Sequence, residues 1–385
     1  MSYGINILKN YASTRLNADD TGAPKTCDFG GTLRARISSQ CVKRTIRSSD
    51  IFQNSFEENM RGIRTRKMPE LVADILRKNG VDEETIEVVT LNLSSFGLGE
   101  KGKPKTVGKT NSIIFFAPEE INTMANAIQD RIEEITKEAK DEKAAKKALK
   151  AEKYIKIIEK LNINGMTPDI ALFGRMITMD NMCNVESASS VSQAISTTRT
   201  IIEDDYFTAT DDLIFNTGPD AEDSGAAMLG STNFNSACYY LYAHIDTKKL
   251  KENLAGINDV VDDIAKAAIK AFITAMCLDD PSGKQNSFAS HPLPSAILIE
   301  REDDDVPMPI SYHNAFLEDV NKKPGRDVVE KSINALVEEV EAAHNDFGLD
   351  KESYWFCSSK YNIDLNGAVK CSSFKELIDN IVDSI

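Results

Sequence analysis

Residues 29–49 read FGGTLRARISSQCVKRTIRSS and contain the pattern on which the fold prediction rests. Two adjacent glycines mark a turn, and the serine pair that follows can cap a helix with apolar residues on one face. Residues 1–48 hold eight Lys or Arg against three Asp, a local charge of +5. Lys43, Arg44 and Arg47 fall on one side of the predicted helix, whose first turn offers free amide groups to a phosphate. The stretch therefore predicts a phosphate-binding helix, and a plain solvent-exposed helix face is the alternative.

The chain as a whole has the opposite charge balance. Its 385 residues include 45 Lys or Arg and 60 Asp or Glu, a net charge of −15. An acidic surface repels polyanions, so a nucleic-acid binder is expected only where positive charge is concentrated locally. The seven cysteines are scattered without a CxxC pair, and no apolar run is long enough to cross a membrane. We expect a cytoplasmic protein with reduced thiols, built from two or three domains or from one domain with insertions.

Working outward from residues 29–49, the predicted elements define an α+β fold. Their order is strand, helix, strand, strand, helix, strand, which is the ferredoxin-like arrangement of RNA-recognition motifs (RRMs). A helical, basic insertion follows the first helix, and an acidic insertion with loop or hairpin character follows the second strand. The six elements cover residues 4–9, 38–49, 169–176, 236–246, 257–279 and 294–300.

The helical insertion carries a run of lysines. Residues 137–160 hold nine Lys and five Asp or Glu, a net charge of +4. The lysines recur every three or four residues, which places them on one side of a helix. A solvated helix is one interpretation, and a weak, salt-dependent contact with duplex nucleic acid is the other.

The acidic insertion raises the question of catalysis. Residues 203–223 carry eight acids and no base. Among them, Asp204, Asp205, Asp211 or Asp212 could hold a divalent metal that cleaves a phosphodiester. No His lies nearby, no nucleophile motif such as GxSxG is present, and the four His of the chain have no metal-ligand spacing. We therefore expect no catalytic residue, metal or cofactor, and a metal-dependent ribonuclease remains the alternative.

Four blocks of sequence resemble, in order, the backbone subunit CasC of type I-E CRISPR Cascade complexes, in the Cas-seven family of the RAMP superfamily. A shorter fifth match, GKQNSFA at 283–289, follows them. The C-terminal 85 residues match in length and helical character more than in motif. The four blocks are the quoted stretch at 29–49, DIALFGRM (169–176), AISTTRTIIEDDYFTATDDL (194–213) and GSTNFNSACYYLYAHIDTKKLKENL (230–254).

The resemblance implies a subunit shaped like a right hand, with an RRM-type palm, helical fingers and an extended hairpin thumb. Several copies would polymerise along the spacer of the guide RNA (crRNA), kink every sixth nucleotide and support hybridisation of target DNA in antiviral defence. The implied partners are crRNA, target DNA and the other Cascade subunits, while a separate helicase-nuclease cuts the DNA. The implied boundaries are 1–60, 166–180 and 233–300 for the palm, 61–165 for the fingers, 181–232 for the thumb, and 301–385 for a C-terminal acidic loop and helices.

The resemblance also implies roles for individual residues. The guide backbone would be held by Arg36, Ser39, Gln40, Lys43, Arg44 and Arg47. Apart from the resemblance, a basic residue in the Gly-containing turn GKQN suits a single phosphate contact, so Lys284 and Gln285 are added to the RNA-binding residues. Met176 would be a wedge beside the kinked nucleotide, and Phe207, Thr208 and Leu229 would cover the displaced base. Incoming duplex DNA would be guided by Lys143, Lys146, Lys147 and Lys150. Apolar wedges suit such a role because every base presents a face for packing, whatever the sequence. A general single-strand RNA-binding protein is the remaining alternative.

Overall fold

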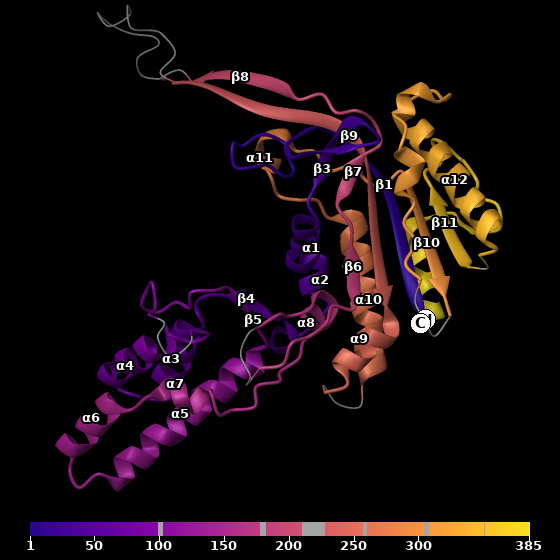
Figure 1. The fold of residues 1–385 in the computed structure, drawn as a ribbon. Coiled ribbons are helices and arrows are strands. Elements are labelled where there is room, and N and C mark those ends of the chain that lie inside the picture. The colour runs from indigo at the N-terminus through magenta and orange to yellow at the C-terminus, as the bar shows by residue number, and fades with distance from the viewer. Residues whose placement is uncertain (99–102, 178–181, 210–227, 257–259, 304–307, 350) are drawn as a thin grey trace, which may run out of the picture. The chain divides into compact units, whose positions relative to one another are not determined.

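The computed structural model describes residues 1–98, 103–177, 182–209, 228–256, 260–303, 308–349 and 351–385 (Figure 1). The chain divides into two compact units, and each unit contains both helices and strands. The predicted α+β class is therefore confirmed. We call them the sheet unit and the helical unit. The sheet unit comprises Met1–Phe52, Ser189–Asp246 and Ile269–Ile385, and the helical unit comprises Gln53–Ala188 and Thr247–Ala268.

The sheet unit is organised around one long pair of antiparallel strands. Strand β1 (Ser2–Thr14) pairs with β9 (Met228–Asp246) on one side and with β10 (Ala296–Glu302) on the other. The strand order across the sheet is β12-β11-β10-β1-β9-β7-β3-β2. Residues 5–9 of β1 are all buried, so both faces of the strand are covered there. One face packs on helix α12 (Val328–Phe347).

The stretch that decided the sequence prediction forms a hairpin and a helix. Strands β2 (Thr26–Phe29) and β3 (Thr32–Ile37) are joined by a turn at two glycines with positive φ. A Cβ on Gly30 would lie 1.8 Å from the carbonyl oxygen of Leu317, so no other residue fits there. Helix α1 (Ser39–Ser48) follows, with the Ser38 hydroxyl accepting from the amide of Cys41. The predicted helix over 38–49 is confirmed.

The predicted strand over 169–176 is wrong. Residues 169–173 instead belong to helix α8 (Pro168–Phe173), which lies in the helical unit. Proline is favoured in the first turn of a helix, and Gly174 ends this one with a φ of +77°. The position beside β9 is instead taken by two short strands, β6 (Ser189–Val191) and β7 (Ala194–Ser196).

The sheet extends further at its C-terminal edge than the sequence analysis indicated. The predicted helices near 327–346 and 374–384 correspond to α12 and α13 (Phe374–Ser384). Between them, strand β11 (Glu352–Cys357) pairs with β10, and β12 (Val369–Cys371) pairs with β11. The segment after residue 301 is therefore not only loop and helix. Its other elements are the short helices η3 (His313–Phe316) and η4 (Val320–Lys322).

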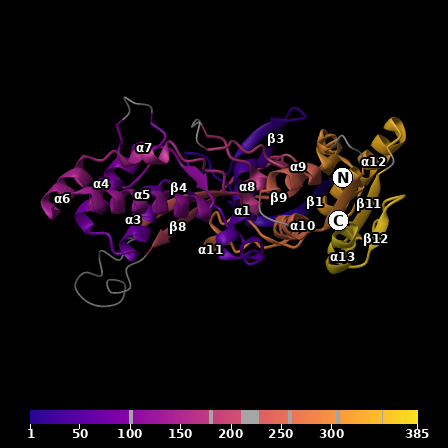
Figure 2. The same cartoon turned by 90° about the horizontal axis from the view of Figure 1, so that it is seen from below.

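The helical unit has its own apolar core. Helices α3 (Met68–Lys78), α4 (Glu83–Leu93) and α5 (Pro118–Glu138) supply most of it. A two-stranded sheet joins β4 (Ile63–Thr65) to β5 (Ile114–Phe116). In both ribbon views, α6 (Glu142–Ala151) lies at one end of this unit (Figures 1 and 2). The remaining elements are η1 (Glu58–Met60), α7 (Tyr154–Ile158), α9 (Thr247–Leu254) and the start of α10 (Val261–Leu278); α2 (Asp50–Gln53) lies at the boundary of the units.

Within the described residues, no helix combines the length and the apolar character needed to span a bilayer.

Candidate nucleic-acid interface

Helix α1 presents its cationic side chains on a single face. Gln40, Lys43, Arg44 and Arg47 follow i, i+3, i+4, i+7 spacing, opposite the buried Val42 and Ile46. Arg44 is exposed, and partial burial lowers the pKa of Lys43 from its usual value. No acid lies in the first turn. Within the described part of the chain, no carboxylate forms an ion pair with Lys43 or Arg44, so both can receive an anion.

The two arginines of β3 differ in their surroundings. Arg34 is fully buried and donates to the carbonyl oxygens of Phe316 at 2.8 Å and Phe29 at 3.3 Å. Burial lowers the pKa of its guanidinium. The donors of Arg34 therefore serve the fold and are not free for a phosphate. Arg36 is half-buried, and it donates to the Thr26 carbonyl at 3.1 Å and to the Gln193 side chain.

The GKQN segment is a rigid turn that β1 anchors. Buried Lys9 pairs with Asp280 at 2.7 Å, and Tyr11 donates to the same carboxylate at 2.6 Å. A Cβ on Gly283 would lie 2.4 Å from the Leu16 carbonyl oxygen, so the turn packs directly on backbone. Lys284 is exposed and has a left-handed backbone, with a φ of +55°. This geometry suits a fixed cation at a turn.

The side-chain amide of Gln285 is used inside the turn. It begins the one-turn helix α11 (Gln285–Phe288), and its side-chain nitrogen donates to the Ser290 carbonyl at 2.9 Å. Its side-chain oxygen accepts from the Ser290 amide at 2.9 Å. Since both ends of the amide are used inside the turn, Gln285 holds the turn in shape rather than presenting a free amide.

A cavity of about 370 Å³ connects α1 to this turn inside the sheet unit. Arg44 and Ser48 line one side, and Asp279 and Gly283 line the other. Burial raises the pKa of Asp279, and its Oδ2 atom has no hydrogen-bond partner in the described structure. A carboxylate repels a phosphate, so we expect a nucleic-acid backbone to pass over the outer face of α1 rather than enter the cavity.

The acidic insertion contains a two-stranded ribbon, as the hairpin interpretation predicted. Strand β8 (Glu203–Ala209) pairs with the start of β9, and the ribbon extends beyond the rest of the sheet unit (Figure 1). Residues paired across the ribbon share a face, so Thr208 and Leu229 lie together on one face. Phe207 lies on the other, opposite Gly230, where a Cβ would lie 2.3 Å from its ring. Phe207, Thr208 and Leu229, which were predicted to act together, therefore lie on two different faces of the ribbon.

The face with Phe207 continues toward α11. Phe234 is four residues after Gly230 in β9, so it lies on the same face as Phe207. The centroid of its ring is 5.6 Å from that of the Phe288 ring. Met228 lies on the same face and is 58% exposed. Tyr206, on the opposite face, is 65% exposed. Sequence reasoning did not select Met228 or Tyr206, because each stands next to another apolar residue and no period-two alternation marks it.

The candidate metal-binding acids are only partly described. Asp204 accepts a hydrogen bond from Asn233, and Asp205 is exposed on the opposite face of the ribbon. Asp211 and Asp212 lie outside the described residues. Among the residues with described positions, no group of three His, Cys, Asp or Glu could hold a metal ion.

In the helical unit, Met176 directly follows a residue of a buried ion pair. Its own side chain is 93% exposed. The neighbouring Arg175 is buried and pairs with Glu120 at 2.8 Å. Arg175 also donates to the carbonyl oxygens of Phe115 and Cys183, both at 3.2 Å. An exposed apolar side chain on such a fixed support is well placed to act as a wedge.

The predicted DNA-binding lysines share one face of α6 but differ in pairing. Lys146 pairs with Glu142 at 2.9 Å, and Lys150 pairs with Glu84 at 2.5 Å. Lys143 and Lys147 have no ion pair with any residue that the structure describes. Half of this cationic stripe is therefore neutralised by local acids.

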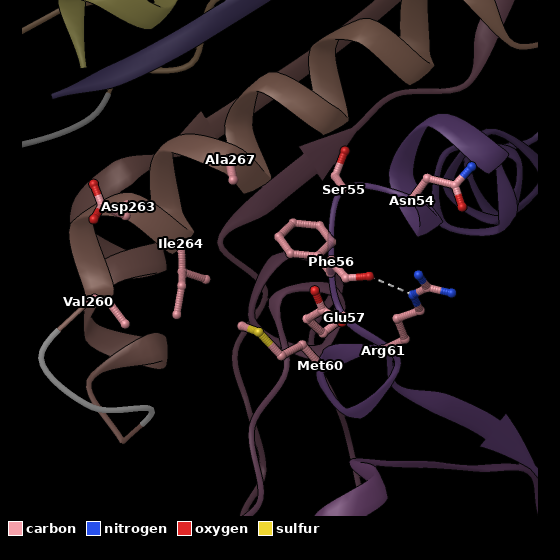
Figure 3. Close-up of a pocket in the computed structure, with 10 residues that line it drawn as sticks. All are labelled: Asn54, Ser55, Phe56, Glu57, Met60, Arg61, Val260, Asp263, Ile264 and Ala267. Carbon is pink, nitrogen blue, oxygen red and sulfur yellow. Dashed lines mark hydrogen bonds between the residues drawn. The ribbon is translucent and has the colours of Figure 1, made fainter.

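The helical unit also contains a cavity of about 460 Å³ between residues 54–61 and the start of α10 (Figure 3). Figure 3 shows Arg61 donating to the Phe56 carbonyl, at 2.9 Å, beside this cavity. Its lining combines apolar side chains with Glu57 and Asp263 and contains neither His nor Cys. This composition does not indicate an active site.

Comparisons with known proteins identify a family and a fold. The sequence matches the family described as CT1975-like protein over residues 4–382. No curated protein matches it. Two solved chains, from a "CRISPR RNA-guided surveillance complex, pre-nicking" and a "CRISPR RNA-guided surveillance complex", have TM-scores of 0.78 and 0.69 and are 24% and 21% identical; each match covers 100% of both chains. These likenesses show that the chain has the same fold.

Proposed function

The chain belongs to the CT1975-like protein family, and from this we propose that it is the crRNA-binding backbone subunit of a type I-E CRISPR Cascade surveillance complex. In this role it polymerises along the guide spacer in the cytoplasm and has no catalytic activity. Its partners are crRNA, target DNA and the other Cascade subunits, and a separate helicase-nuclease cuts the DNA. The solved chains that share its fold come from complexes of this kind.

One observation carries the proposal. Within the sheet unit, Arg44 of the basic α1 face and Gly283 beside Lys284 line one cavity, and the ring of Phe288 in α11 lies 5.6 Å from that of Phe234 on the ribbon face with Phe207. A cationic helix face that leads to exposed apolar side chains suits a strand whose phosphates are gripped and whose bases are displaced.

We infer a ferredoxin-like palm from the central strands. The neighbours β10-β1-β9-β7 are all antiparallel, and this order corresponds to the fourth, first, third and second strands of that fold. The second strand comes from β6 and β7 instead of residues 169–176. In such a complex the guide reads sequence by base pairing, so the protein needs no base-edge contacts.

The two faces of the ribbon predict two separate effects on bound RNA. Phe207→Ala and Leu229→Ala each remove an exposed apolar side chain, from opposite faces. We expect each substitution to loosen the regular kink and to change RNA reactivity at different nucleotides. Chemical probing of RNA bound to each variant measures this, with Thr232→Ala on the ribbon as a control. A pattern identical to that of the unmodified protein for both variants contradicts the thumb role.

Co-purification from the native host tests the function itself. A single RNA species with repeat-derived ends, together with companion proteins, is the expected result. A general single-strand binding protein would instead bring down unrelated RNAs as readily as RNA with CRISPR repeats.

The enzymatic alternative, a metal-dependent RNA endonuclease that uses thumb aspartates, has its own test. The complex is incubated with complementary RNA and Mg²⁺. Cuts at regular intervals that disappear in an Asp204→Asn, Asp205→Asn variant would establish the enzyme, and intact RNA is what the proposed function requires.

A further inference from the structure

The helical unit carries a second concentration of positive charge, separate from α6. Residues 61–67 read RGIRTRK and hold four cations, and residues 103–110 read KPKTVGKT and hold three. Neither stretch contains an acid, although the whole chain has a net charge of −15. Seven cations without an interleaved carboxylate are a stronger anomaly than the lysine run of residues 137–160.

Backbone pairing brings these two stretches together. Strand β4 pairs with β5, with Arg64 opposite Phe115. Beyond the strand, the Thr110 amide donates to the Arg66 carbonyl at 2.8 Å, and Arg66 Nε donates to the Thr110 carbonyl at 2.7 Å. Gly108, with a φ of +81°, donates to Ser94 Oγ at 2.8 Å. The cations are therefore displayed on a hydrogen-bonded framework rather than on a tail.

Most of this charge is not neutralised locally. Lys67 pairs with Glu70 at 3.2 Å, and both side chains remain largely exposed. Arg61 and Arg66 each use Nε on a backbone carbonyl, which orients the guanidinium without cancelling its charge (Figure 3 for Arg61). Ion pairs are absent, as far as the structure describes the chain, from Arg64, Lys103, Lys105 and Lys109.

Apolar side chains accompany these cations. Val107 is 61% exposed and Ile113 58%, whereas Ile63, 36% exposed, lies on the face of β4 opposite Arg64. A surface of this kind suits a nucleic-acid strand. Its phosphates can bind the cations, and its sugars and bases can pack against the apolar side chains. Guanidinium groups bind phosphate oxygens through paired donors, and lysines add long-range attraction.

We propose that these seven cations (Arg61, Arg64, Arg66, Lys67, Lys103, Lys105 and Lys109), the β4-loop surface, form a nucleic-acid-binding site that contacts the sugar-phosphate backbone. The site is distinct from the α1 face and from the α6 lysines. It holds a strand without reading its sequence, because it offers charge and aliphatic contacts rather than side-chain amides placed for base edges.

The test uses the full-length chain and three labelled probes of one mixed sequence: single-stranded RNA, single-stranded DNA and duplex DNA. The variant is Arg64→Gln, Lys103→Gln, Lys105→Gln, whose side chains are exposed and without ion pairs among described residues. The control is Lys322→Gln, Lys360→Gln, Lys375→Gln, which removes the same charge from exposed positions in the sheet unit. Binding is measured from low to high salt.

The expected result is a slope of log K against log[salt] that falls in magnitude by about two units for single strands, or nearer three for duplex DNA, in the variant. The control should match the unmodified protein. The probe that loses most affinity identifies whether the strand is RNA, DNA or a duplex. Unchanged slopes for all three probes overturn the proposal.

The same measurement in a Lys43→Ala, Arg44→Ala, Arg47→Ala background separates this inference from the proposed function. Because the two surfaces share no residue, their effects on log K should add. Loss of slope from the β4-loop variant with no effect of the α1 substitutions would support the second site and reject the α1 grip. The reverse outcome would reject the second site alone.

Discussion

Replacement of Lys43, Arg44 and Arg47 by alanine is expected to weaken RNA binding about 100-fold, since each lost phosphate contact costs on the order of 1 kcal/mol. The three side chains share the outer face of α1. The slope of log K against log[salt] should fall in magnitude by about two units, because each contact to a single strand releases about 0.7 of a counterion. A filter-binding or fluorescence titration at several salt concentrations measures both quantities.

The fold should survive these changes. Val42 and Ile46 keep the buried face of the helix, and alanine is a better helix former than the residues replaced. Lys322→Ala, Lys360→Ala, Lys375→Ala removes the same number of positive charges from exposed positions and is the control for lost charge. Equal affinity and equal slope in the α1 variant and the unmodified protein would remove this face from the interface.

Helix α1 could be predicted from sequence because its signals are local. The cap at Ser38 and the apolar period of the helix lie within a dozen residues of each other. The strand assigned to DIALFGRM failed for an equally local reason: an apolar run of that length fits a buried helix as well as a strand. Pro168 and Gly174 mark the two ends of helix α8, and they were the signals in the sequence that indicated a helix.

Other features depend on contacts that no local pattern contains. Arg34 and Arg36 are two residues apart in β3 and therefore share a face. Only Arg34 is enclosed, because the carbonyl groups of residues 316–317 accept its hydrogen bonds. The short strands β6 and β7 are held by β9, which lies about fifty residues later. The β4-loop surface likewise requires the pairing of β4 with β5. The three lysines of residues 103–110 can be counted in the sequence, but the hydrogen bonds that join this stretch to Arg66 cannot be read from it.

Arg175→Met is expected to lower the free energy of unfolding by about 3–5 kcal/mol, because it leaves the Glu120 carboxylate buried without its cation. It also removes the donors to the Phe115 and Cys183 carbonyl groups. For a unit of this size, the melting temperature should fall on the order of 10 °C. Thermal unfolding of the full chain, followed by circular dichroism, measures the change.

A second substitution distinguishes the buried charge from lost packing. In Arg175→Met, Glu120→Gln the carboxylate is neutral, while the glutamine oxygen can still accept from the Ala117 amide as Glu120 does at 2.8 Å. The double variant should therefore recover part of the loss, on the order of 2 kcal/mol. A double variant as unstable as the sum of the single variants would show that the charge is not the cause.

The dependence on pH gives the same argument an independent check. Burial raises the pKa of Glu120 above its usual 4.5, and the charge of Arg175 opposes that rise. Without Arg175 the pKa in the folded state should rise further, so the folded state takes up a proton more readily than the unfolded state. Stability of Arg175→Met should then increase as the pH falls from neutrality through that raised pKa toward 4.5, and the gap to the unmodified protein should narrow. If the difference in unfolding free energy between the two proteins stays constant over this pH range, the loss is due to packing. The backbone at Met176 would then be held by side-chain packing and not by the neighbouring ion pair.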